Sequence, residues 1–180
     1  HSPLPVASRA VRLLLAEAAE GNWDCSAAHI EAVLALCKSN DPSARYSLPR
    51  QLTVLREYGQ LVFTHAPDPG PLEEFIPVQG ENPIPGTAWA MVLGAPPWPG
   101  LAVRSRKVGD AITLPGRPRK SVKELFINEK VPRRLRERIP LAADGDGVLA
   151  LADFGANTSH PRSNLVRFIL REKEEIDHGK

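Results

Sequence analysis

The sequence has few of the residues that mark membrane or secreted proteins. Its 180 residues include two cysteines and one methionine, and 6% are aromatic. No apolar run approaches the roughly 20 residues that a membrane-spanning helix needs, and residues 1–30 lack the layout of a signal peptide. We therefore expect a soluble, cytoplasmic protein that does not associate with membranes.

The two cysteines, Cys25 and Cys37, have no second pair to join and only scattered histidines around them. This excludes a disulfide framework and leaves no set of zinc ligands. We expect both thiols to pack as small apolar groups, and we expect no metal site in this chain.

Two motifs that would indicate phosphate or calcium chemistry are incomplete. The segment VGDAITLPGRPRKS contains glycines and a Lys-Ser pair, but it lacks the Gly-x-x-x-x-Gly-Lys-Ser/Thr spacing whose amides wrap phosphates. The sequence Asp144-Gly-Asp-Gly147 lacks the later calcium ligands, among them a glutamate at the twelfth position, and Asp-Gly is typical of a hairpin turn. Since no nucleophile lies in a recognisable setting, we predict no catalytic residue.

Basic residues are concentrated in the second half of the chain. Residues 1–100 contain 6 lysines and arginines and 10 acidic residues, whereas residues 101–180 contain 17 and 11. Between Arg104 and Arg138 the imbalance is sharpest, at 12 basic to 4 acidic residues. Such an asymmetry indicates a polyanionic partner for this half.

Length and composition indicate a globular protein of one large domain or two small ones. The sequence is 42% hydrophobic and 24% charged, which is near the average for soluble domains. It begins with His1, and its only methionine is Met91. We therefore expect a piece of a longer protein.

Residues 6–20 and 27–38 follow the 3.6-residue period of amphipathic helices. The stripe expected to face the core in the first helix includes Leu13 and Leu14. The two segments together predict a helical hairpin, which we interpret as the end of a helical domain over residues 1–42.

After residue 42 the pattern changes to β-strands. The segments LTVLREY and LVFTHA cluster β-branched and aromatic residues around a turn at Tyr58-Gly59-Gln60. Residues 67–99 then hold half of the chain's 18 prolines, so EEFIPVQ and TAWAMVLG are predicted as edge strands joined by rigid loops. We interpret residues 43–100 as a β-hairpin followed by a proline-rich β segment.

Residues 101–180 mix helices and strands and form the third predicted domain. Ser121-Val-Lys-Glu124 has the Ser-x-x-Glu form of a capping box, and PRRLRER predicts a second short helix that ends before Pro140. The segments IPLAA, GVLALADF and NLVRFILRE predict strands, and the first two are joined by the turn at 144–147. This order of elements is that of an α+β protein.

The basic residues from Arg104 to Lys123 allow three interpretations. The simplest interpretation is a solvated surface without a ligand, because runs of charged residues usually face solvent. A membrane surface would need a long amphipathic helix, whereas the helix after Ser121 is predicted to have only about ten residues. A nucleic acid fits better, because the cations lie on a predicted strand, a proline-stiffened loop and a helix start. Few aromatic residues accompany them, so the backbone phosphates of a structured RNA or DNA are the expected contacts.

The order VRSRKVGD, LPGRPRKSVKELFINEKVPRRLRERIPL and DGDGVLAL resembles the C-terminal domain of bacterial tRNA(Ile)-lysidine synthases. That domain has an Arg-x-Arg-x-x-Gly-Asp segment, a basic loop, a lysine-containing helix ending in Phe, and a Val/Ile-Pro…Arg…Pro-Leu segment. The earlier SAAHIEAVLAL and YSLPRQLTVLREYGQLVF resemble the end of the family's helical middle domain and the hairpin after it. The resemblance covers nearly the whole chain and is weakest over residues 67–99.

The resemblance implies an activity that resides outside this chain. Synthases of this family attach lysine to the wobble cytidine of a tRNA in an N-terminal domain with a Ser-Gly-Gly-x-Asp-Ser loop, which this sequence does not contain. ATP and Mg are therefore expected in that domain and no cofactor here. This chain is expected to hold the acceptor stem of tRNA without catalysing the reaction, and a homodimer is a further option.

The resemblance also implies the fold, because the family's C-terminal domain resembles a domain of the phenylalanyl-tRNA synthetase β chain. We expect an α+β protein in which a short N-terminal helical hairpin precedes a β-rich, sandwich-like domain with two short helices on one side.

Carried over residue by residue, the resemblance assigns contacts with tRNA phosphates to a set of cations. These are Arg104, Arg106, Lys107, Arg117, Arg119, Lys120, Lys123, Arg133, Arg134 and Arg136. Gly109 and Asp110 are expected to shape the turn that presents them, and Arg134 stands where many relatives have an aromatic residue. The alternative is a structural or protein-interaction α+β domain that binds no nucleic acid.

Overall fold

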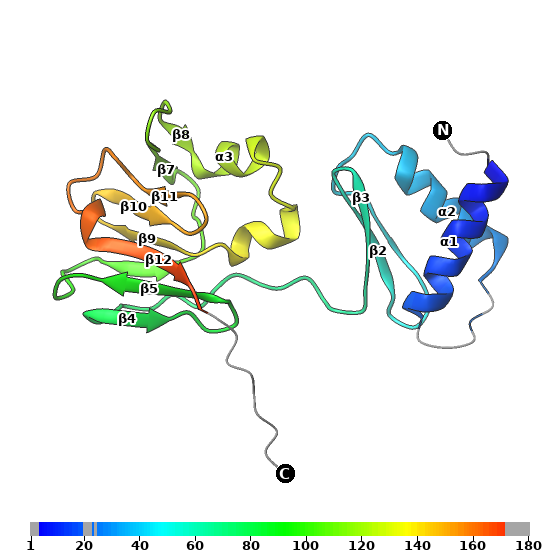
Figure 1. Cartoon of the computed structure of the whole chain (residues 1–180), viewed down its shortest axis with the longest axis horizontal. Coiled ribbons are helices and arrows are strands. Elements are labelled where there is room, and N and C mark those ends of the chain that lie inside the picture. Colours follow the sequence, from blue (N-terminus) through cyan, green and yellow to red (C-terminus); the bar gives the residue numbers. More distant parts are fainter. Residues whose placement is uncertain (1–3, 20–22, 24, 172–180) are drawn as a thin grey trace, which may run out of the picture. The chain divides into compact units, whose positions relative to one another are not determined.

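A computed structural model describes residues 4–19, 23 and 25–171 of the chain (Figure 1). Its contacts divide the chain into two compact units, His1–Asp68 and Pro69–Lys180. This division differs from the predicted boundaries after residues 42 and 100, because the hairpin packs on the two helices and the proline-rich strands pair within the second unit. None of the described helices is both long and apolar enough to cross a bilayer.

The first unit packs two helices against a three-stranded antiparallel sheet. Its elements, in chain order, are α1 (Leu4–Ala18), α2 (Ala27–Lys38), β1 (Arg45–Ser47), β2 (Thr53–Glu57) and β3 (Gln60–Thr64). The predicted helix pair and hairpin are confirmed, although residue 20, the predicted end of the first helix, lies outside the described residues.

Two predictions about burial in the first unit were wrong. Leu13 and Leu14 are 64% and 45% exposed, while Val11 and Leu15 are buried, because α1 turns this i, i+4 pair toward the core that it shares with α2 and the sheet. Cys25 is buried as expected, but Cys37 is exposed near the end of α2.

The described residues of the second unit form three small antiparallel sheets. Its elements are β4 (Gly80–Pro83), β5 (Trp89–Leu93), β6 (Ala102–Arg104), β7 (Ala111–Ile112), β8 (Lys120–Ser121), α3 (Val122–Asn128), the 3-10 helix η1 (Arg133–Arg138), β9 (Leu141–Asp144), β10 (Gly147–Leu151), β11 (Gly155–Ala156), the 3-10 helix η2 (Ser163–Leu165) and β12 (Val166–Leu170). The strand orders are β11-β10-β9-β6, β12-β5-β4 and β7-β8.

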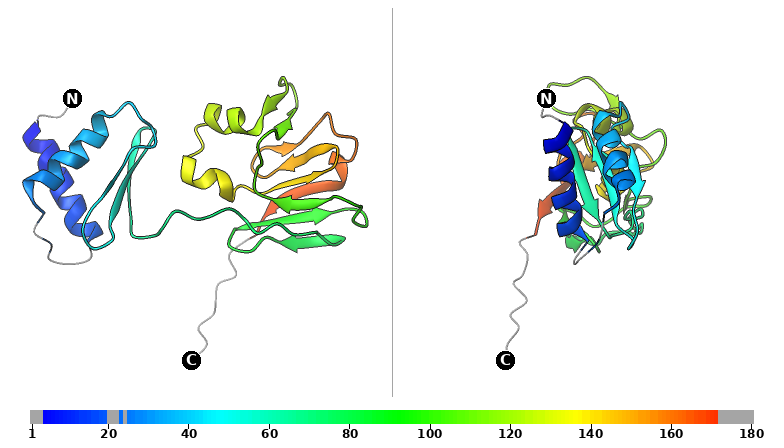
Figure 2. Two further views of the ribbon diagram at one scale, coloured as in Figure 1. Left: turned by 180° about the vertical axis from the view of Figure 1, so that it is seen from behind. Right: turned by 90° about the vertical axis from the view of Figure 1, so that its right-hand side faces the viewer.

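The central strands β9 and β10 are buried on both faces. Ala142 and Leu149 join the core that contains β5 and β12, whereas Leu141 and Val148 face the core under α3. A β-bulge between Val148 and Ala150 interrupts the alternation. Figure 2 (left) shows this layered arrangement from behind. The predicted α+β class with a sandwich-like domain is therefore confirmed.

Two local predictions need correction. Residues 73–79 form no strand beyond an isolated bridge from Phe75 to Val103, and β4 forms just after them, at the edge of its sheet, where Pro83 needs no ladder partner for its nitrogen. The segment TAWAMVLG forms β5, but this strand lies in the centre of its sheet, between β12 and β4, and not at an edge. The predicted short helix in PRRLRER is present as the 3-10 helix η1, none of whose residues is buried.

The capping box at the start of α3 gives a stability prediction. The Ser121 hydroxyl accepts a hydrogen bond from the Glu124 amide at 3.1 Å, and the Glu124 carboxylate accepts one from the Ser121 amide at 3.3 Å. Ser121→Ala should lower the free energy of unfolding of the second unit by about 1 kcal/mol. Urea denaturation, combined with hydrogen exchange at the α3 amides, measures this change.

The matched control is Ser163→Ala, since the Ser163 hydroxyl has no hydrogen bond to another described side chain or amide. An equal loss in both variants would contradict a stabilising role for the capping box.

Candidate nucleic-acid interface

The basic segment begins with an arginine that is held inside the fold. Arg104, the last residue of β6, donates from Nη1 to Asp110 Oδ2 at 2.7 Å and from Nη2 to Oδ1 at 2.9 Å. The two side chains are only 12% and 10% exposed. The hydrogen bond to Asp110 raises the pKa of Arg104. This guanidinium is therefore largely enclosed by the fold and is bound to Asp110.

Asp110 also closes the turn that follows β6. Its carboxylate accepts a hydrogen bond from the Lys107 amide at 2.5 Å, and its own amide donates to the Lys107 carbonyl at 3.2 Å. Gly109, with φ of +94°, takes a left-handed backbone that a side chain would disfavour. The Asp110 carbonyl then accepts the amide of Val122, the first residue of α3, at 2.9 Å.

Asp110 remains ionised because its hydrogen bonds outweigh its burial. Burial alone would raise the pKa of this carboxyl, but the hydrogen bonds from Arg104 and from the Lys107 amide, together with both positive charges, lower it below its ordinary value. A carboxylate in this position stabilises the turn as long as it is charged.

The next two cations are also paired. Arg106 lies beyond the end of β6, contacts Glu137 at 2.8 Å and is 23% exposed. Lys107 contacts Glu74 at 2.7 Å, but it is 60% exposed. A pair as exposed as the second is worth at most about 1 kcal/mol, so Lys107 can exchange its partner for another anion.

The loop between β7 and β8 carries the accessible cations. Arg117 pairs with Glu129 at 2.5 Å and remains 54% exposed. Arg119 is exposed, and no described residue forms a hydrogen bond or ion pair with its guanidinium. Lys120 lies half-buried on β8, and Lys123 is exposed in the first turn of α3.

The cations of η1 fall into two groups. Arg133 is exposed. Arg134 and Arg136 are half-buried and interact with other parts of the chain, with Arg136 Nε donating to the Val131 carbonyl at 3.0 Å. Arg138 donates to the Gly86 carbonyl. Arg133 is thus the exposed cation of this helix.

Of the cations predicted to bind tRNA, five are thus exposed: Lys107, Arg117, Arg119, Lys123 and Arg133. We refer to them as the exposed cations. The others are wholly or partly enclosed by the fold, which uses Arg104 as an internal brace.

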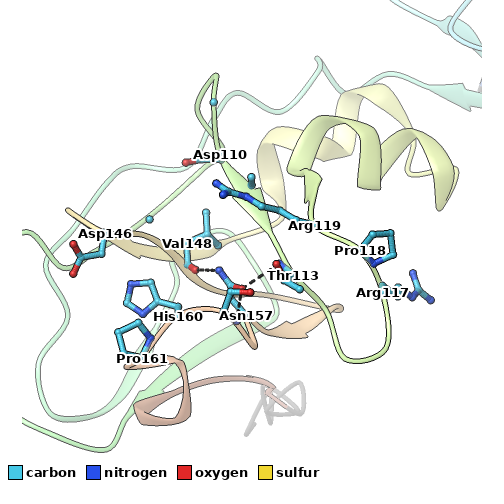
Figure 3. Close-up of a pocket in the computed structure, with 14 residues that line it drawn as sticks. Asp110, Thr113, Arg117, Pro118, Arg119, Asp146, Val148, Asn157, His160 and Pro161 are labelled. Carbon is cyan, nitrogen blue, oxygen red and sulfur yellow. Dashed lines mark hydrogen bonds between the residues drawn. The ribbon is translucent and has the colours of Figure 1, made fainter.

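A pocket of 640 Å³ lies beside the β7–β8 loop (Figure 3). In the figure, Arg119 extends toward its centre, Asp146 and His160 lie on the opposite side, and Arg117 lies at the far edge. Sequence analysis missed Asn157 and His160, because no local pattern near them indicates that the fold brings them next to the basic loop.

Three acidic or histidine side chains by this pocket lie close together, and two of them, Asp144 and His160, are hydrogen-bonded to each other. The ligand atoms of Asp144, Asp146 and His160 lie within 4.8 Å of one another. Asp144 accepts hydrogen bonds from Trp98 Nε1 at 2.9 Å and from His160 Nε2 at 3.0 Å. We assign no metal to this group.

Comparison with known proteins identifies relatives of this domain. Residues 101–167 match the family model described as the TilS substrate C-terminal domain. The tRNA(Ile)-lysidine synthase of Geobacillus kaustophilus is 32% identical over 167 residues, covering 81% of this chain and 36% of that protein. The enzyme of the same name from Geobacter sulfurreducens is 34% identical over 143 residues, covering 67% of this chain and 30% of that protein.

The chain therefore spans about a third of the length of these curated relatives. A solved structure described as "Crystal structure of TILS C-terminal domain" is 24% identical, with a TM-score of 0.41, and the match covers 56% of this chain and 99% of that chain.

The Arg104–Asp110 pair gives a prediction about stability and pH. Asp110→Asn removes the charge from a nearly buried pair and should lower the free energy of unfolding of the second unit by about 1–3 kcal/mol at neutral pH. Because the pKa of Asp110 is lower in the folded protein than the roughly 3.9 of an unfolded aspartate, the stabilisation is present above that pH. It is lost as the pH falls through the folded pKa, so the variant should lose less stability than the parent below about pH 4.

Urea titrations at a series of pH values measure both effects. The matched control is Asp68→Asn, since Asp68 and Arg45 form an ion pair in the first unit that is 40% and 55% exposed and should matter little. Equal losses from the two variants would contradict the role assigned to Asp110.

Proposed function

We propose that this chain, whose residues 101–167 match the family model of the TilS substrate C-terminal domain, is the tRNA-binding C-terminal part of a tRNA(Ile)-lysidine synthase. In this proposal the chain holds tRNA in position and carries out no chemistry itself. ATP and Mg would bind to a catalytic domain outside this chain. The proposed location is the cytoplasm, where such an enzyme would meet its substrate.

The exposed cations are the observation that supports this proposal best. Three of them, Arg117, Arg119 and Lys123, come from one short stretch made of the β7–β8 loop and the first turn of α3. Lys123 lies at the positive end of the helix dipole, where a cation is locally unfavourable. A bound phosphate would relieve that repulsion.

The chemistry of this surface favours backbone phosphates over bases. The large aromatic side chains of the second unit are buried or half-buried, including Phe126 at 0% exposure and the partly buried Trp89 and Trp98. No described ring is offered there as a stacking platform, so the contacts expected are those between lysine or arginine and phosphate. A double-stranded region of tRNA, for which we propose the acceptor stem, provides a regular array of such phosphates.

The remaining predicted contacts take different roles in this proposal. Lys120 is half-buried and would contribute at the margin of the surface. Arg104 and Arg106 would hold the turn that carries Lys107, and Arg134 and Arg136 would fix η1. A homodimer remains a proposal that sedimentation velocity can test.

A salt titration tests the proposed surface. If the five exposed cations each neutralise a phosphate, the plot of log K against log salt should have a slope of roughly −4 to −5. Replacing Arg119, Lys123 and Arg133 together by alanine should flatten the slope to about −2, because about three contacts are lost. Fluorescence anisotropy with a labelled tRNA transcript measures both slopes.

Arg167→Ala is the matched control, since Arg167 is an exposed cation on β12, away from the β7–β8 loop. It should leave the slope unchanged. No binding at low salt would favour the alternative of a structural or protein-interaction domain, and an unchanged slope in the triple variant would refute the assignment of these residues.

A further inference from the structure

We propose that the pocket beside the β7–β8 loop binds one unpaired nucleotide of the RNA that the exposed cations hold. This inference rests on the proposed function and adds a second mode of recognition to it. Arg119, which lines the pocket, would contact the phosphate of a single nucleotide that has left the stack, and the other exposed cations would contact phosphates of a duplex.

The pocket has the size and the walls of a small-ligand site. Its 640 Å³ lie within the range of roughly 300 to 1,000 Å³ that such sites span. One wall consists of β7 and the loop up to Arg119, and the other consists of the turn at Asp146 and the segment 157–161. The walls come from distant parts of the chain, so the pocket exists only in the folded domain.

The charges that line the pocket leave two groups without partners. Asp110 is paired with Arg104, and Arg117 with Glu129. For the side chains of Arg119 and Asp146, the described part of the chain offers no hydrogen bond or ion pair. The pocket thus presents one available guanidinium and one available carboxylate.

His160 contributes a neutral ring to this pocket. Its Nδ1 accepts a hydrogen bond from the Arg162 amide at 3.2 Å, so its proton is on Nε2, which donates to Asp144 at 3.0 Å. Its ring therefore adds no charge between Arg119 and Asp146, and both of its nitrogens are already used.

A nucleotide matches this set of groups. Its phosphate would pair with Arg119, and hydroxyl or amino donors of its sugar or base would reach the Asp146 carboxylate. The base would lie against Pro118 and Pro161, which line the pocket. A base within a duplex is stacked and has its pairing edge occupied, whereas an unpaired base can enter such a site.

Asn157 makes the pocket rigid before any ligand binds. Its Oδ1 accepts hydrogen bonds from the Thr113 and Ser159 amides, each at 3.1 Å, and its Nδ2 donates to the Val148 carbonyl at 2.6 Å. These hydrogen bonds, drawn in part in Figure 3, connect the segment just after β7, strand β10 and the segment after β11. Because such a site is already ordered, binding a ligand there costs little further conformational entropy.

The test compares two RNA hairpins with the same stem, one blunt and one with unpaired nucleotides at its 3′ end. Fluorescence anisotropy with the full chain should give about tenfold tighter binding for the hairpin with the unpaired end, in line with what one charge-assisted hydrogen bond contributes. Ser159→Trp, which fills the pocket from its exposed rim, should abolish this difference and leave the affinity for the blunt hairpin unchanged. Asn164→Trp, at an exposed position in η2 outside the pocket, is the matched control and should retain it.

The outcomes separate the two proposals. Equal affinity for both hairpins would overturn the pocket and leave the proposed function standing, as would a difference that survives in Ser159→Trp. Failure of both hairpins to bind at low salt would overturn the proposed function and the pocket with it. Removal of the tenfold difference by a free nucleoside monophosphate, without loss of blunt-hairpin binding, would support the pocket and extend its ligand to free nucleotides.

Discussion

The bidentate pair between Arg104 and Asp110 is the interaction on which the candidate interface depends. It joins the end of β6 to the start of β7, and the Asp110 carbonyl holds the first amide of α3. One aspartate thereby fixes three elements, and with them the loop that carries the accessible cations. Because both charged groups are largely buried, removing either one would leave the other as an unpaired buried charge.

The sheet beneath this turn has two buried faces, and this explains both its sequence and its position. A strand that packs on both sides has no polar alternation, which is why GVLAL reads as a continuous apolar run. The bulge between Val148 and Ala150 shifts the register of β10, so that Leu149 and Ala150 both enter the core with β5 while Val148 faces α3. The turn at Asp144 is thus held firmly at the end of two buried strands, and Asp146 stands on a rigid support at the pocket's edge.

The features that could be predicted from sequence depend on residues close together in the chain. The capping box at Ser121, the turn at 144–147 and the apolar strands around it follow from spacing alone, and all are present. The buried face of α1, the exposure of Cys37 and the difference between Arg104 and Arg119 depend on contacts with distant segments. Asp110 is six residues from Arg104, yet no pattern distinguishes an arginine that will brace a turn from one that will face solvent. The pocket could not be predicted for the same reason, because Asn157 is far along the chain from Thr113, whose amide donates a hydrogen bond to it.

The difference between enclosed and exposed arginines changes what the excess of basic residues means. Between Arg104 and Arg138 the chain has 12 basic residues to 4 acidic ones, and composition alone treats all of them as part of one electrostatic footprint. All four acidic residues interact with groups of this same segment. Asp110 pairs with Arg104, Glu137 with Arg106 and Glu129 with Arg117, and Glu124 caps α3. The acidic residues thus stabilise the fold of the segment. Two of the cations without an acidic partner among the described residues, Arg119 and Lys123, lie directly after Pro118 and in the first turn of the capped helix α3. Cations held in fixed positions can match the regular spacing of phosphates on a duplex. A flexible basic tail would lose conformational entropy when it adopts the same spacing.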